Sequence, residues 1–237
     1  MKTILCKNDS QWIETAAGQI RAQIMERKPD STLALACGQT MAPVWDRLAD
    51  YCKDGSLRLS TARILCVTEL CEVPAEKSCR HALQMGLLEK TDARAENCFF
   101  PDPDAPEAYD ALIESLGGLD LAVLGIGEDC HIGYNEPGVL FESGTHVQKL
   151  TDRTKRQLLK RGFSADDMPE RAVTMGIKTL TRARDILLLA RGGEAVGLLS
   201  CLSLWERSPS AHTGAERVSR RGSQERVYSR RPLSKTA

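Results

Sequence analysis

The sequence lacks any long hydrophobic run. None of its apolar stretches approaches the roughly 18 residues that a membrane-spanning helix needs, and the apolar stretch at the N-terminus is too short for a signal peptide. Hydrophobic residues make up 42% and charged residues 27% of the 237 residues, which is ordinary for a globular chain. We therefore exclude membrane, secreted and fibrous proteins and expect a cytoplasmic protein built on one α/β domain.

The nine cysteines form no zinc or redox motif. None belongs to a Cys-x-x-Cys pair, and none has a histidine at zinc-ligand spacing. Most lie in apolar stretches, as Cys66 does, so we interpret them as small buried hydrophobic residues in a reducing compartment. Cys130 precedes His131, but sequence neighbours usually point apart, which disfavours a Cys–His ion pair.

Charge is balanced over the whole chain but not along it. Residues 207–237 contain eight Lys and Arg against two Glu, a net charge of +6, which leaves −6 for the preceding 206 residues. The same segment has no Asp, Ile or Phe, so it has little apolar surface to offset chain entropy. We predict an α/β domain over residues 1–191 and a poorly ordered basic tail over residues 192–237.

Three interpretations of this tail stay open. It is a solvated basic segment, a nucleic-acid-binding arm, or the product of a reading frame lost near residue 192, where the composition changes abruptly. We favour the solvated segment and expect neither a nucleic-acid nor a membrane partner.

Short apolar strands alternate with helices along the first 206 residues. We expect strands at 3–7, 32–36, 63–67, 121–124, 172–175 and 186–190, and helices at 9–24, 44–52, 78–88, 106–116 and 152–161. This alternation predicts a mostly parallel, doubly wound sheet with helices on both faces. Ligands bind beyond the carboxyl ends of such strands, which selects the loops 37–40, 68–74 and 125–138.

The 125–138 loop carries the densest set of polar groups. Its two leading glycines permit close approach of a ligand to the backbone, and Asp129, His131 and Glu136 follow within eight residues. A histidine flanked by carboxylates has its tautomer fixed and its charged form stabilised, which suits proton transfer. The alternative is a tight turn with a solvated histidine. Two carboxylates and a single histidine are a poor metal set, so we predict no metal.

The turn Gly38-Gln39-Thr40 lies between a predicted strand and a predicted helix. Its backbone N–H groups and the Thr40 hydroxyl are placed to hold a phosphate at the positive end of that helix. Neither a P-loop nor a dinucleotide fingerprint is present. Lys160 and Arg161, near the end of a later helix, are candidate cationic partners of the phosphate, or an ordinary solvated helix end.

Residues 125–137, Gly-Ile-Gly-Glu-Asp-Cys-His-Ile-Gly-Tyr-Asn-Glu-Pro, resemble the Gly-x-Gly-x-Asp-Gly-His-Ile-Ala-Phe-Asn-Glu-Pro loop of glucosamine-6-phosphate deaminases. Residues 35–40 are similar to the Gly-Gly-Thr phosphate turn of that family. Residues 172–180 are similar to its Ala-Leu-Thr-x-Gly-x-x-Thr-Leu segment. The resemblance runs from about residue 1 to 191, and the Asn-Glu-Pro ending favours the deaminases over the related 6-phosphogluconolactonases.

The resemblance implies a Rossmann-like fold, a homo-oligomer and no metal or organic cofactor. It implies an enzyme that opens the ring of a phosphorylated amino sugar, isomerises aldose to ketose and releases ammonia. By position, His131 would transfer the ring-opening proton, with Asp129 and Glu136 orienting it. The Gly38–Thr40 turn would line the phosphate site, and Arg161, or Lys160 beside it, would bind the phosphate.

Three positions and the C-terminal segment depart from the family pattern. The aspartate that abstracts a proton in the family falls at Thr68, and Glu69 replaces it only if the loop leaves strand geometry, since alternate residues of a strand face opposite sides. Cys130 replaces a glycine, and Glu194 falls where the family has a phosphate-binding lysine. The basic tail replaces the closing strand and helix.

These departures leave two alternatives beside the enzyme. One is a non-catalytic phosphosugar-binding paralogue, and the other is a 6-phosphogluconolactonase-like hydrolase. Val139, His146 and Gln148 occupy the positions where some family members bind an allosteric sugar phosphate, so we predict no such regulation.

Overall fold

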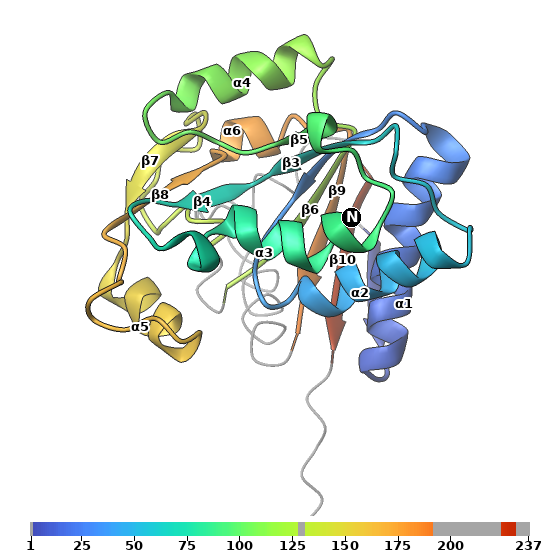
Figure 1. Ribbon diagram of the computed structural model, residues 1–237, viewed down its shortest axis with the longest axis horizontal. Helices are drawn as coiled ribbons and strands as arrows, with labels where there is room; N and C mark the ends of the chain where they lie inside the picture. The colour runs from blue at the N-terminus through green and yellow to red at the C-terminus, as the bar shows by residue number, and fades with distance from the viewer. Residues whose placement is uncertain (1, 128–130, 192–223, 231–237) are drawn as a thin grey trace, which may run out of the picture.

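The computed structural model describes residues 2–127, 131–191 and 224–230. Within these residues seven strands form one sheet in the order β1-β10-β9-β6-β2-β3-β5 (Figure 1). Every pairing in this sheet is parallel, as predicted. The strands are β1 (Lys2–Cys6), β2 (Thr32–Leu35), β3 (Arg63–Cys66), β5 (Cys98–Phe99), β6 (Leu121–Gly125), β9 (Asp185–Ala190) and β10 (Gln224–Arg230).

Helices connect these strands, and three of them begin at a side-chain cap. Asn8, Ser78 and Thr151 each accept a hydrogen bond from a backbone N–H in the first turn of the helix that follows. The helices are α1 (Asp9–Ala22), α2 (Ala42–Lys53), α3 (Cys79–Gly86), α4 (Pro106–Ser115), α5 (Asp152–Lys160) and α6 (Ile177–Leu180). Shorter turns are η1 (Gln23–Arg27), η2 (Ala75–Lys77), η3 (Leu88–Lys90) and η4 (Ala95–Asn97).

The strand residues divide alternately between two hydrophobic clusters. On β2, Leu33 and Leu35 pack into the cluster that holds the apolar residues of α1, α2 and α3. Ala34, between them, packs into the cluster that holds Tyr109 and Ile113 of α4. Successive side chains of a strand point to opposite faces, so each face of the sheet is buried under helices. The doubly wound α/β fold is therefore present.

A second, three-stranded antiparallel sheet was not predicted. It has the order β4-β8-β7, with β4 (Thr68–Leu70), β8 (Arg171–Thr174) and β7 (His146–Lys149). The Met175 N–H donates to the Val67 carbonyl at 2.8 Å and joins this sheet to the end of β3. In Figure 1 the small sheet lies beside α5, away from α1 and α2. It forms one flank of the region beyond the strand ends.

Residues 224–230 lie within the tail for which we expected little order, and they form β10. This strand lies between β1 and β9, and both pairings are parallel. The expectation of a poorly ordered tail therefore does not hold for these seven residues, because the backbone hydrogen bonds of two neighbouring strands are available to them. The rest of the tail, Glu194 included, lies outside the described residues.

No helix in the described part of the chain is long and apolar enough to cross a membrane.

Candidate active site

A cavity of about 520 Å³ opens beyond the carboxyl ends of the central strands. The turn after β2, the end of β6, strand β4, the start of α3 and the end of α5 all contribute to its wall. All three loops selected from the sequence, 37–40, 68–74 and 125–138, supply lining residues. The cavity therefore lies at the sheet edge where the general rule for parallel sheets places a ligand.

His131 lines the cavity and is half-buried. The Gly127 N–H donates to the His131 carbonyl at 3.0 Å, which holds residue 131 beside the end of β6. A Cβ at residue 127 would collide with the imidazole ring, so the ring lies directly against the backbone there. The sequence pattern indicated close approach of a ligand to the backbone, whereas at residue 127 the group that approaches is the chain's own His131 ring.

Residues 133–135 hold the histidine loop against β8. Gly133 has φ of 63°, and a Cβ there would lie 2.8 Å from the Thr174 Oγ1 atom. The Asn135 Nδ2 donates to the carbonyls of Ile132 at 2.8 Å and Met175 at 2.9 Å. Asn135 is therefore part of the scaffold of the loop, since its buried amide is bound to two backbone carbonyls.

The Glu136 carboxylate is buried and anchors the start of α5. It accepts hydrogen bonds from the Thr154 hydroxyl at 2.6 Å and from the Thr151 N–H and hydroxyl, both at 3.2 Å. Glu136 is not among the residues that line the cavity, although Thr154 is. Its position behind the wall makes it a brace for α5, whereas the sequence placed it beside the imidazole. The other predicted partner of His131, Asp129, lies outside the described residues, as does Cys130.

Thr68 lines the cavity but Glu69 does not. Residues 68–70 form strand β4, so adjacent side chains point to opposite sides. The Glu69 carboxylate accepts from the backbone N–H groups of Cys79 at 2.7 Å and Arg80 at 2.8 Å, and so caps α3. The structure does not bring Glu69 into the site, because the chain keeps the strand geometry that excludes it.

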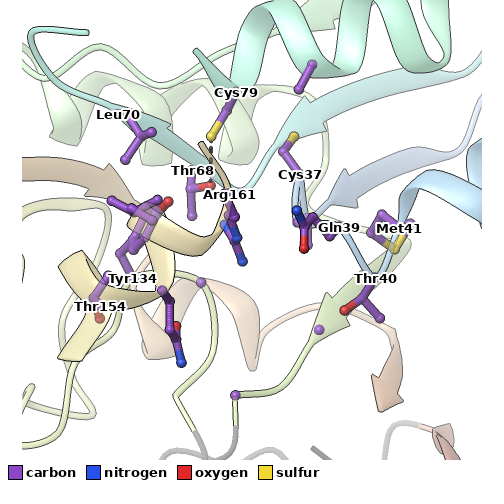
Figure 2. Close-up of a pocket in the computed structure, with 18 of the residues that line it drawn as sticks. Cys37, Gln39, Thr40, Met41, Thr68, Leu70, Cys79, Tyr134, Thr154 and Arg161 are labelled. Carbon is purple, nitrogen blue, oxygen red and sulfur yellow. Dashed lines mark hydrogen bonds between the residues drawn. The ribbon is translucent and has the colours of Figure 1, made fainter. Parts of the chain in front are cut away.

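The predicted phosphate turn and the predicted phosphate-binding arginine face each other. Gly38, Gln39 and Thr40 line the cavity at the start of α2, and Lys160 and Arg161 line it at the end of α5. A Cβ at Gly38 would lie 3.9 Å from the Arg161 Nη2 atom. Figure 2 shows the Arg161 side chain extending into the space between Thr68 and Gln39. Two segments about 120 residues apart in sequence thus form one site.

The cavity is rich in cations. Lys77, which was not predicted, also lines it and binds the Asp167 carboxylate and the Gly162 carbonyl. Lys160 and Arg161 are exposed, and neither has a carboxylate partner in the described part of the chain. Two uncompensated cations beside a helix N-terminus favour an anionic ligand.

Two lining residues that sequence reasoning missed are Cys37 and Cys79. Cys37 directly follows a buried strand and precedes the phosphate turn, which was a signal for a place at the cavity. Cys79 is the first residue of α3, and no local pattern placed it near the site. Of the seven described cysteines, four are buried and three are half-buried, and all are thiols.

A sequence model of the glucosamine-6-phosphate isomerases and 6-phosphogluconolactonases matches residues 8–219. The chain belongs to this family. The match extends past residue 191, where the resemblance seen in the sequence stopped. Among curated relatives, the glucosamine-6-phosphate deaminase of Geobacillus sp. strain WCH70 is 37% identical over 200 residues, covering 81% of this chain and 79% of that protein. The Streptomyces avermitilis deaminase is 38% identical over 181 residues, covering 72% and 69%.

Solved structures of the isomerase–lactonase family share the fold. A monomeric glucosamine-6-phosphate deaminase superposes with a TM-score of 0.88 at 29% identity, covering 98% of both chains. The 6-phosphogluconolactonase of Thermotoga maritima superposes with a TM-score of 0.71 at 20% identity, covering 97% of this chain and all of the other. The second likeness concerns the fold alone.

Proposed function

We propose that this chain binds a phosphorylated amino sugar and acts as a glucosamine-6-phosphate deaminase. The observation that carries the proposal is the approach of Arg161 to the Gly38–Thr40 turn across a cavity that also contains His131. The phosphate binds between the turn and the arginine, which fixes the distance of the sugar ring from the phosphate pocket. The relatives that support the deaminase reaction are 31–38% identical to this chain.

His131 is the acid–base group of the ring-opening step in this proposal. Imidazole exchanges a proton near neutral pH, and ring opening needs one proton delivered to the ring oxygen and one removed from the anomeric hydroxyl. The ring packs closely against Gly127, and such contact limits its movement, which suits a group that must give and take a proton at fixed atoms. We infer that Asp129 orients it, as the family pattern implies.

Thr68 gives a reason to keep a second candidate, a binding protein without turnover. Isomerisation removes a proton from a sugar carbon, and the family base falls at Thr68, whose hydroxyl is a poor base at neutral pH. In the described part of the chain, one carboxylate lines the cavity. It belongs to Glu76, which lies in η2. The lactonase alternative is supported by the likeness in fold to a lactonase of 20% identity. The relatives of 37% and 38% identity described above are deaminases.

The deciding experiment is an ammonia-release assay with glucosamine 6-phosphate. We expect release by the natural chain and a fall of roughly 10²–10⁴-fold in His131→Ala, the usual contribution of general acid–base catalysis. Full turnover in His131→Ala would remove the mechanism. Sugar-phosphate binding by calorimetry with no ammonia would select the binding protein, and hydrolysis of 6-phosphogluconolactone would select the lactonase.

Thr68→Asp, with Thr68→Asn as its isosteric control, tests the missing base. We expect a gain in turnover for the aspartate alone, because only the carboxylate accepts a proton from carbon. An equal response of the two variants would show that residue 68 does not limit the reaction.

A further inference from the structure

Three cysteine thiols meet at the wall of the cavity, and we call them the thiol cluster: Cys37, Cys66 and Cys79. The sulfur atoms of Cys37 and Cys66 lie 2.9 Å apart. The Cys66 thiol also donates to the Thr68 carbonyl at 3.0 Å, and the Cys79 sulfur lies 3.6 Å from the Thr68 hydroxyl. Figure 2 shows Cys37, Thr68 and Cys79 together above Arg161.

Backbone pairing fixes the position of two of these thiols. Leu35 and Cys66 are register partners on the adjacent parallel strands β2 and β3. Cys37 follows Leu35 by two residues, which returns its side chain toward the same face. The third thiol is fixed by the Glu69 carboxylate, which binds the Cys79 N–H at 2.7 Å. Main-chain geometry therefore brings the backbones of these three cysteines to the same region of the sheet.

The cluster has an accessible member and a buried one. Cys37 lines the cavity, whereas Cys66 is fully buried behind it. A disulfide bond is about 2.05 Å long, so the Cys37 and Cys66 sulfurs need to approach by less than about 1 Å.

We propose that Cys37 and Cys66 form a redox-modification site that a low-molecular-weight disulfide oxidises. The Cys37 thiol loses its proton and attacks one sulfur of the reagent RSSR, which breaks the S–S bond and expels RS⁻. The Cys66 thiol then loses its proton and attacks the Cys37 sulfur of the mixed disulfide, expelling the second RS⁻. The two protons convert the leaving groups to two RSH, and the pair of cysteines is oxidised by two electrons.

The surroundings define which reagents suit the site. Contacts with Cys66 and Cys79 and burial raise the pKa of the Cys37 thiol well above its usual value, and burial raises the pKa of Cys66. Because the thiolate is the attacking form, these raised pKa values make the oxidation slow at neutral pH and faster as the pH rises. Lys160 and Arg161 line the same cavity and favour an anionic disulfide, such as glutathione disulfide, over a cationic one.

The modification reaches the phosphate turn through one peptide bond, because Cys37 precedes Gly38. This consequence rests on the proposed function. A disulfide between Cys37 and Cys66 constrains the residue that precedes the turn, and we expect this constraint to weaken phosphosugar binding. Bound phosphosugar in turn covers Cys37 and slows the oxidation.

The test uses the full reduced chain, glutathione disulfide at mildly alkaline pH, and peptide mapping of alkylated protein by mass spectrometry. We expect a Cys37–Cys66 cross-linked peptide that dithiothreitol reverses. In Cys66→Ser, and in Cys66→Ala as a second variant, we expect a glutathione adduct that persists on Cys37. Circular dichroism confirms that each variant is folded.

Cys52→Ser and Cys98→Ser are the matched controls. Both thiols are half-buried and lie outside the cluster, and burial raises the pKa of each to about 11. The cross-link should form at an unchanged rate in both variants. A Cys37–Cys79 link in the natural chain, a link that involves Cys52 or Cys98, or no link at all would overturn the proposal.

Glucosamine 6-phosphate separates this inference from the proposed function. We expect the sugar phosphate to slow cross-linking several-fold, and the oxidised chain to bind it more weakly in calorimetry. A cross-link that forms without any sugar-phosphate binding would retain the modification site and reject the proposed function. Sugar-phosphate binding without a Cys37–Cys66 cross-link would retain the proposed function and reject the modification site.

Discussion

At the scale of single residues, the site depends on Gly127, which has no side chain. The imidazole of His131 occupies the volume that a side chain at residue 127 would need. The glycine is therefore a positioning residue, because it sets how closely the ring approaches the end of β6. The same loop is closed by the hydrogen bond between the two residues, 3.0 Å from N to O.

Gly127→Ala tests this arrangement. The added methyl group must displace the ring, and we expect ammonia release to fall by roughly 10²-fold, the cost of a misplacement of about 1 Å. The measurement is the assay proposed above, with calorimetry to show that sugar-phosphate affinity falls much less. Gly18→Ala is the control, since no atom lies closer than 4.0 Å to the added Cβ and the residue is in α1. Equal turnover in Gly127→Ala and the natural chain would contradict the arrangement.

At the scale of elements, α5 connects the buried Glu136 to the phosphate site. Its first turn is tied to the Glu136 carboxylate through Thr151 and Thr154, and Arg161 follows its last residue. A helix of nine residues moves as one body, so a displacement of the first turn of α5 also displaces the guanidinium of Arg161 at its end. Anchoring of α5 by Glu136 differs from its predicted role of orienting the His131 imidazole. The two roles have different kinetic consequences.

Glu136→Ala separates these roles. Loss of the carboxylate leaves buried donors unsatisfied, and we expect the free energy of unfolding to fall by about 1–3 kcal/mol in urea titrations. If the residue braces α5, KM for the sugar phosphate rises several-fold while kcat changes little. A fall in kcat at unchanged KM would instead support a role at His131. Glu136→Gln should restore part of the affinity, since an amide oxygen still accepts.

Glu170→Ala serves as the control for this variant. Glu170 binds Lys155 of α5 at 2.5 Å, but its side chain is 61% exposed. Exposed ion pairs contribute little to stability, so we expect neither KM nor unfolding to change measurably.

At the scale of the whole molecule, β10 completes the parallel sheet. It brings a segment from the basic tail between β1 and β9, and β1 has no other registered partner among the described strands. The predicted homo-oligomer stays a prediction, and a solved relative is described as monomeric.

A chain that ends at residue 223 tests the contribution of β10. Its removal leaves the backbone groups of β1 and one edge of β9 unpaired. We expect the free energy of unfolding to fall by several kcal/mol, a large part of the roughly 5–15 kcal/mol typical of a domain. The measurement is urea unfolding followed by circular dichroism, with a chain ending at Arg230 as the control. Identical midpoints for the two chains would show that β10 adds nothing to stability.

The sequence by itself determined most strands of the parallel sheet, the longer helices and the sheet edge at which the cavity lies. Apolar strands such as residues 121–124 and 186–190 are readable because burial on both faces makes each of these residues hydrophobic. The loop with His131 was readable because its glycines and its place after a strand are local features. Residues 37–40 were readable for the same reason.

Only the tertiary structure decided which carboxylates reach the cavity and which thiols meet. The Glu69 carboxylate binds the start of α3, and the Glu136 carboxylate binds the first turn of α5. The directions of these side chains depend on the geometry of β4 and on the packing of α5. The approach of Cys37 to Cys66, 29 positions apart in sequence, depends on the strand register that pairs Leu35 with Cys66. Pairing between distant segments, as in β10, is set by the free energy of the whole sheet, and no local pattern carries it.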